Sequence, residues 1–397
     1  MENSVSRVLI ETVVKKALRD VRNSPRRSIR NLVDMALHFS GGRFQHNFFE
    51  IAQTMLQNEH SPYYGLIEDT VAHVDAERLF RFGMNVGYNG CTEGAATIRQ
   101  IEENERYNIP WTMFLHLDAQ QLSEHYGQYQ SLISQGEALG IHTWMLFPES
   151  RTQELLPLAR EHPDSAFALF CEPEAVTPQF VDNVRELDNL MPVVRYGGGA
   201  AGACGQLREA ELLYSVYIRY TQDDVPAIAG GALFEGTQQL HPVFSVLLAA
   251  PGCTDAARKA AYEAVKSARS RQLFQTVAWE AVCDSSFVDS VISSEPCLAA
   301  VDPQGCLVSP RKIGARGSLN VLQNDLTCVL KRAFPKAGGS RVRKTGCSAE
   351  AGASGDPVRK EKEAAGFVRP PLCGWFIRFL PYSGRFPLPP SGQYFSW

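Results

Sequence analysis

The sequence predicts an α/β protein in which parallel strands alternate with helices, and three observations support this fold class. Between residues 111 and 196, short apolar and aromatic runs alternate with segments of helical periodicity. This repeated order implies parallel strands joined by crossover helices. The first 60 residues show apolar residues at helical spacing only. From about residue 335 the periodicity disappears, and the chain becomes rich in Gly, Ser, Pro and Arg.

The N-terminal region is expected to form helices. Val13, Leu18 and Val21 recur at helical spacing, and a second apolar stripe begins at Ile29, after a break at Asn23-Ser24-Pro25. The opposite face is basic, which is typical either of a solvated helix face or of a site for an acidic partner. Its residues are Lys15, Lys16, Arg19, Arg22, Arg26, Arg27 and Arg30.

The α/β region is expected to follow a strand–helix order. The predicted strands are 111–117, 143–147, 166–170, 191–196, 213–220 and 243–249, and the predicted helices are 122–139, 153–161, 178–187 and 255–274. Two glycine-rich segments, 82–91 and 197–202, are interpreted as a turn and a flexible connection. Two short strands are expected around the turn Asp302-Pro303-Gln304-Gly305.

Four regions follow from these patterns: a helical region (1–75), an α/β region (76–275), a C-terminal auxiliary region (276–334) and a basic tail (335–397) expected to be disordered. The chain is 44% hydrophobic and 21% charged, which is ordinary for a globular protein. It contains no run of eighteen apolar residues and no secretory signal, so we expect a cytoplasmic protein without a membrane span. A net charge of -4 gives no nucleic-acid signature, so nucleic acid is not the expected partner.

The segment from Asn108 to Asp118, NIPWTMFLHLD, resembles the first barrel strand of a radical S-adenosylmethionine (SAM) family of anaerobic bacteria. The resemblance continues at 132–140, 161–164, 218–221 and around Cys297, and it covers roughly residues 8–333. It implies a partial (β/α) barrel of radical SAM type with an N-terminal helical region. The cofactors that it implies are a [4Fe–4S] cluster and SAM.

This sequence departs from the family where the cofactors bind. The family's C-x-x-x-C-x-x-C loop is missing, because Leu117 runs directly into the next helix and no cysteine lies between Cys91 and Cys171. Where the family has Gly-Gly-Glu-Pro, this chain has Phe147-Pro148-Glu149-Ser150. The family's polar ends of the third and fourth strands are replaced by Cys171-Glu172-Pro173 and Arg195-Tyr196. We therefore expect neither the cluster nor SAM.

Polar residues end four of the predicted strands. His116 and Asp118 end the first, and Glu149, Glu172 and Arg195 end the next three. Since ligands bind at the carboxyl ends of parallel strands, these residues form a candidate pocket for an anion or a metal. The alternative interpretation is that polar strand ends face water.

Three of the ten cysteines, Cys283, Cys297 and Cys306, form a candidate metal or auxiliary iron–sulfur site, although their spacing fits no zinc signature. Buried thiols are the alternative. Three hypotheses for function remain open. The first is a pseudoenzyme that binds an intact radical SAM paralogue, another protein or a ligand. The second is an enzyme that uses these cysteines or the strand-end carboxylates. The third is a module that binds an anionic partner through the basic helices and the tail.

Overall fold

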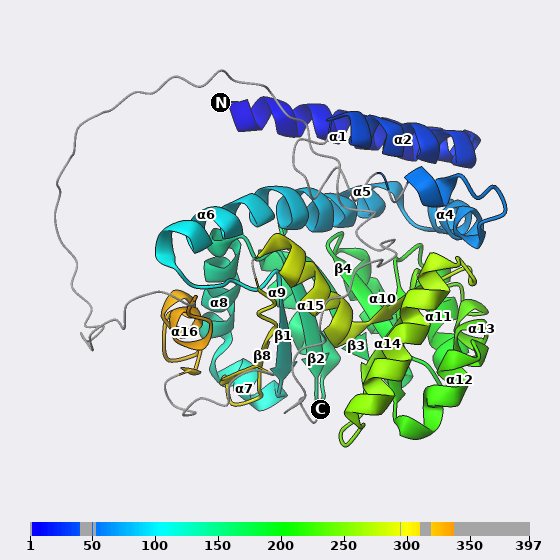
Figure 1. Ribbon diagram of the computed structural model, residues 1–397. Helices are drawn as coiled ribbons and strands as arrows, with labels where there is room; N and C mark the ends of the chain where they lie inside the picture. Colours follow the sequence, from blue (N-terminus) through cyan, green and yellow to red (C-terminus); the bar gives the residue numbers. More distant parts are fainter. Residues whose placement is uncertain (1, 40–49, 51–52, 294, 310–318, 337–397) are drawn as a thin grey trace.

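The computed structural model describes residues 2–39, 50, 53–293, 295–309 and 319–336. Its described residues form one nine-stranded sheet of order β7-β6-β5-β4-β3-β2-β1-β8-β9, with helices around it (Figure 1). Each pair of neighbouring strands is parallel, except the antiparallel hairpin β8–β9. The predicted fold class, α/β with a partial (β/α) barrel and N-terminal helices, is confirmed. The predicted tail lies almost entirely outside the described residues.

The strands are β1 (Thr112–Leu117), β2 (Thr143–Pro148), β3 (Ala166–Cys171), β4 (Leu190–Arg195), β5 (Ser215–Tyr220), β6 (Phe244–Ala249), β7 (Val277–Glu280), β8 (Ala299–Val301) and β9 (Leu307–Val308). The first six agree with the predicted strands to within two residues. The predicted hairpin around Asp302–Gly305 is also present, with Gly305 at a φ of 80°. The four-residue strand β7 was not predicted.

Helices cover both faces of the sheet. The crossover helices on the outer face include α8 (Tyr126–Leu139), α9 (Leu156–Glu161), α10 (Pro178–Arg185), α11 (Ala200–Glu209), α12 (Val225–Ala229), α13 (Ala232–Gln238) and α14 (Asp255–Ser270). Ala261 and Val265 of α14 share a core with Ile218 and Leu247, which point outward from β5 and β6. Val282 and Val288 of α15 (Ala281–Ile292) instead belong to the larger core. Figure 1 shows that α15 crosses the inner face, on the side of the sheet opposite α8 and α9.

The N-terminal helices lie across the amino ends of the strands. They are α1 (Glu2–Asn23), α2 (Pro25–Phe39), α4 (Pro62–His73) and α5 (Ala76–Met84) (Figure 1). The predicted break before Pro25 is confirmed. Helix α5 continues without interruption into a π-helix, η1 (Asn85–Gly94), and then into α6 (Ala95–Glu105).

Three sequence predictions were wrong. The glycine-rich segment 82–91 is helical rather than a turn, because Gly94 lets the helix backbone approach the carbonyl oxygen of Gly140 too closely for a Cβ. The segment 197–202 is not a flexible connection throughout, because α11 begins at Ala200 after a turn with Gly199 at a φ of 83°. The helix expected at 122–139 is divided at His125 into α7 (Ala119–Glu124) and α8.

One buried carboxyl group connects α15 to the start of the sheet. Asp289 is fully buried, and its Oδ1 accepts a hydrogen bond of 2.6 Å from the backbone N–H of Trp111, just before β1. The backbone of Cys297, just before β8, also hydrogen-bonds this carboxyl group. Burial raises the pKa of Asp289 to about 8, so the group is largely protonated at neutral pH.

Candidate functional site

The candidate site is the mouth of the partial barrel, which we define as the carboxyl ends of β1–β5 on the inner face. The strand register places His116 opposite Phe147, and Arg195 opposite Tyr217. Alternate residues of a strand share a face, so His116, Glu149, Glu172 and Arg195 project to the same side of the sheet. The structure thus brings the predicted strand-end residues to one edge.

Asp118 at this edge caps a helix. Its Oδ1 accepts hydrogen bonds from the backbone N–H groups of Gln120 (2.9 Å) and Gln121 (3.0 Å), which opens α7. An N-cap carboxylate satisfies donors that the helix itself leaves unpaired. The chain therefore passes from the last residue of β1, Leu117, through a single capping residue into helix. No loop separates the two elements.

Glu172, Arg195 and Tyr217 form a polar group on the rim of the mouth. Arg195 Nη1 lies 3.3 Å and 3.2 Å from the two carboxylate oxygens of Glu172, and the Tyr217 hydroxyl donates to Glu172 Oε1 at 3.2 Å. Burial and the Glu172 charge both raise the pKa of Tyr217, so its hydroxyl remains protonated. The ion pair is about half exposed on both sides. Such pairs contribute at most about 1 kcal/mol to stability.

Glu149 is exposed, and among the described residues no partner contacts its side chain. Its backbone N–H donates to the carbonyl of Leu117 at 3.0 Å, which holds the end of β2 beside the end of β1. Glu149 therefore contributes an unpaired negative charge to the rim. Arg219, at the end of β5, is an exposed positive charge that the sequence analysis did not single out.

Below the rim, a row of rings fills the inner face. The imidazole of His116 stacks on Phe147 (4.8 Å, 9°), Phe147 stacks on Phe170 (4.3 Å, 23°), and Phe170 meets Tyr217 edge-on (5.3 Å, 66°). Phe147, Phe170 and Tyr217 are buried. Offset stacking and edge-to-face contacts are the favoured arrangements of aromatic rings. Sequence reasoning missed this row, although its signal, an aromatic residue near the end of three strands, was present.

The row of rings also controls the protonation of His116. Burial, and in the same direction the positive charge of Arg219, lower its pKa to about 4. Neighbouring strands are about 4.8 Å apart, so a flat sheet would separate β1 from β5 by roughly 19 Å. Arg219 influences His116 because the sheet curls. The imidazole is neutral at pH 7.

The candidate cysteines are spread over the C-terminal part of the fold. Cys297 is buried just before the amino end of β8, and Cys306 follows the turn at its carboxyl end, where Asn320 Nδ2 lies 3.8 Å from Sγ. Cys283 lies in the first turn of α15, where burial holds the pKa of its thiol well above the usual range. Within the described part of the chain, no three His, Cys, Asp or Glu side chains are grouped as a metal site.

A buried polar cluster lies next to Cys283, where α14, β7 and α15 meet. Arg269 donates two hydrogen bonds of 2.7 Å to the carboxylate of Asp284. Glu280 accepts from the Cys283 backbone N–H at 2.6 Å and from the Tyr220 hydroxyl at 3.3 Å. The two terminal nitrogens of Arg269 pair with Asp284, whereas its Nε is buried and has no hydrogen-bond partner among the described residues. The arrangement is that of a structural junction between α14, β7 and α15.

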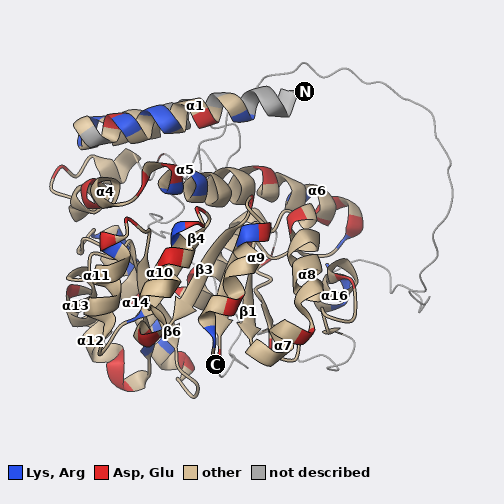
Figure 2. Ribbon diagram, turned by 180° about the vertical axis from the view of Figure 1, so that it is seen from behind, with Lys and Arg blue, Asp and Glu red and all other residues tan. Residues whose placement is uncertain are grey.

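Lys and Arg residues are frequent on α1 (blue in Figure 2), and some of the basic residues of α1 and α2 form ion pairs within the chain. Lys15 lies 3.5 Å from Glu77, and Arg30 lies 3.5 Å from Glu59. Arg7 contacts Glu11 at 3.1 Å and Asp164 at 3.4 Å. Lys16, Arg19 and Arg27 are exposed. None of the helices described here is both long and apolar enough to span a membrane.

Comparison with known proteins gives a likeness in structure alone. No family model and no curated protein sequence matches the chain. Crystal structures of SuiB from Streptococcus suis are similar, with a TM-score of 0.46 and 9% identity over 59% of this chain and 68% of SuiB. The structure of SuiB bound to S-adenosylmethionine has a TM-score of 0.46 and 8% sequence identity, and the match covers 59% of this chain and 66% of SuiB. At such low sequence identity the similarity concerns the fold of the backbone, and no role of a SuiB residue is assigned to a residue of this chain.

Proposed function

We propose that this chain is a radical SAM-like protein that does not hold the catalytic cluster and that acts by binding a partner. The junction between β1 and α7 carries this proposal. A [4Fe–4S] cluster is held by cysteine thiolates. Here Leu117, Asp118 and Ala119 connect strand to helix with no room for a cysteine loop, and the Asp118 carboxylate is engaged as the helix cap. The donor set does not fit the cluster.

The interior of the mouth supports the same proposal. The rings of His116, Phe147 and Phe170 occupy the inner face where a ligand of a partial barrel would lie. Phe147 also replaces a residue whose backbone would have to approach a ligand, and Pro148 offers no backbone N–H. A mouth filled by stacked rings favours recognition at its rim over chemistry in its interior.

The rim suits a protein partner. Glu149 and Glu172 carry negative charge, Arg195 and Arg219 carry positive charge, and all four are exposed. Mixed charges of this kind give orientation and specificity to an interface. We propose an intact radical SAM paralogue as the first candidate partner, since a scaffold can keep an interface after its chemistry is lost.

Iron and sulfide content after anaerobic reconstitution tests the loss of the cluster. We expect background iron and no SAM cleavage for the full chain. The double variant Cys297→Ser/Cys306→Ser, with Cys328→Ser as its control, is expected to give the same values. About four irons and four sulfides per chain together with SAM cleavage would overturn the proposal. Iron lost only in the double variant would favour an auxiliary-cysteine enzyme instead.

Binding of a purified radical SAM paralogue tests the partner. Sedimentation of the mixture should show a complex, which the charge reversal Arg195→Glu weakens at least tenfold. Lys259→Glu, which changes an exposed charge on the outer helix α14, is the matched control and should leave the affinity unchanged. Equal affinities for the two variants would exclude the rim as the binding surface.

A further inference from the structure

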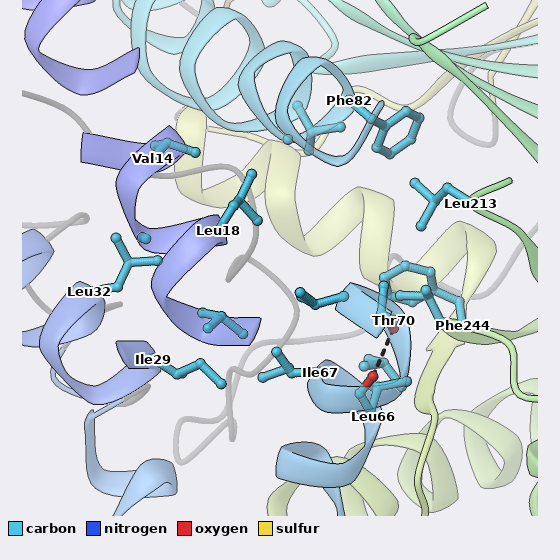
Figure 3. A pocket seen from close by; sticks show the side chains of 17 residues that line it. Val14, Leu18, Ile29, Leu32, Leu66, Ile67, Thr70, Phe82, Leu213 and Phe244 are labelled. Atoms are coloured by element: carbon cyan, nitrogen blue, oxygen red, sulfur yellow. Dashed lines mark hydrogen bonds between the residues drawn. The ribbon is translucent and has the colours of Figure 1, made fainter. Parts of the chain in front are cut away.

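A cavity of about 100 Å³ lies at the end of the barrel opposite the mouth. Val14 and Leu18 of α1 and Ile29 and Leu32 of α2 border it on one side (Figure 3). The other sides of the cavity are bordered by α4, α5 and the amino ends of β5, β6 and β7. The residues of α4 and α5 include Leu66, Ile67, Val71 and Phe82. The cavity thus lies between the N-terminal helices and the sheet.

The lining of this cavity is apolar. Among its seventeen lining residues, Thr70 has the one polar side chain. The Thr70 hydroxyl donates to the carbonyl of Leu66 in its own helix at 2.8 Å, so it is already satisfied. A ligand with a polar group would therefore find no hydrogen-bond partner among these side chains, and burying such a group costs free energy.

The cavity exists because α1 and α2 do not pack fully against the sheet. Val14, Leu18 and Leu32 face the core but are only partly buried, whereas Val33, on the same helix as Leu32, is fully buried. Protein interiors are normally packed without voids larger than a water molecule. An apolar void of this size lowers stability unless something apolar fills it.

We propose that this cavity is a binding site for a small, uncharged hydrocarbon group of about the size of one aromatic ring. Apolar cavities of about 150 Å³ in other proteins remain dry and bind benzene or xenon. The bound group would contact the α1–α2 pair and the sheet at the same time. Since a ligand of the folded state stabilises it, occupancy would fix the N-terminal helices on the barrel. This site is independent of the mouth and of the function proposed for it.

Benzene is a suitable probe, with the full chain and its thermal unfolding as the readout. Benzene near its solubility limit should raise Tm by roughly 2 °C. Phenol has the same shape plus one hydroxyl, and it should bind about tenfold more weakly because that hydroxyl loses its water without gaining a partner. No rise with benzene, or an equal rise with phenol, would overturn the proposal.

Two matched variants locate the site. Ala17→Leu adds volume to the α1 wall and should abolish the benzene-induced rise, whereas Ala72→Leu adds the same volume to the exposed side of α4 and should retain it. Leu18→Ala enlarges the cavity and should give a rise at least as large as in the unchanged chain. A rise that Ala17→Leu preserves, or that Leu18→Ala reduces, would contradict the assignment.

Discussion

At the residue scale, His116 is a partly buried residue of the mouth whose ring stacks on the buried Phe147. Burial and, after it, the positive charge of Arg219 lower the pKa of His116 to about 4 and keep the imidazole neutral. A histidine that titrates well below neutral pH does not act as a proton carrier at pH 7. At physiological pH the residue is therefore neutral and contributes its ring to the stack.

His116→Phe should make the protein less sensitive to acid. The unfolded histidine binds a proton below about pH 6.5, whereas the folded one does so only near pH 4, so folding stability falls by roughly 1 kcal/mol per pH unit across this window. Phenylalanine preserves the stack and removes this slope. Urea unfolding from pH 7 to pH 4 measures it. His60→Phe, at an exposed position, is the control that should keep the original slope.

At the element scale, the π-helix η1 joins α5 and α6 into one helical segment that lies across the amino ends of the strands. Asn85 and Asn89 donate from their side chains to the carbonyls of Pro163, Ser165 and Asp164 at 2.8 to 2.9 Å. Together with the close approach of Gly94 to Gly140, these bonds fix η1 against the loops at the amino ends of β2 and β3. The glycines here serve packing and not a turn.

Gly94→Ala and Gly202→Ala should have opposite effects on the free energy of unfolding. A Cβ at Gly94 would collide with the carbonyl oxygens of Gly140 and Asn89, so we expect a loss of about 2 kcal/mol or more. A Cβ at Gly202, inside α11, meets nothing within 4 Å, and there alanine should add about 0.5 to 1 kcal/mol. Urea unfolding measures both. A loss at both positions would contradict this assignment.

The elements that sequence reasoning identified share strong local signals. The strands β1 to β6 are six-residue runs rich in apolar and aromatic residues, and Thr177 with Pro178 marks the start of α10. The elements that it missed lack such signals. Helix α11 contains Gly202 and Gly205, which have low helix propensity, and β7 has only four residues. The glycines of η1 suggest a turn when only the sequence is known. The contact between Gly94 and the backbone of Gly140, which explains a glycine inside a helix, is visible only in the structure.

The candidate site was predictable only in part for a similar reason. Strand parity and the strand-end rule identified His116, Glu149, Glu172 and Arg195. The contact between Phe170 of β3 and Tyr217 of β5, which skips strand β4, and the effect of Arg219 on His116 depend on the curl of the sheet. No local pattern specifies that curvature.

At the scale of the whole molecule, α15 spans the inner face between β7 and the start of β1 and β8. The buried Asp289 connects these parts through Trp111 and Cys297. Ser293, just after the helix, adds a hydrogen bond of 3.3 Å to the carbonyl of Ile109. The partial barrel is thus closed by a helix whose final turns are fixed to the entry of the first strand.

Asp289→Asn should change the pH dependence of global stability. The folded carboxyl has a pKa of about 8, against about 4 in the unfolded chain, so its contribution is fully present below pH 4 and is lost as the pH rises to 8. Asparagine preserves the acceptor for Trp111 and does not titrate. Relative to the unchanged chain, the variant should gain stability from pH 5 to pH 8 in urea unfolding. Asp182→Asn, at an exposed position, should show no such gain.

The strands at the two edges of the sheet are shorter than those in its middle. The terminal strands β7 and β9 have four and two residues, whereas β1 to β6 have six each. A terminal strand offers unpaired backbone groups on which another chain can add a strand, and a short strand offers few of them. Among the described residues, the sheet therefore offers only short edges for edge-to-edge polymerisation, and its six-residue strands β1 to β6 each lie between two neighbouring strands.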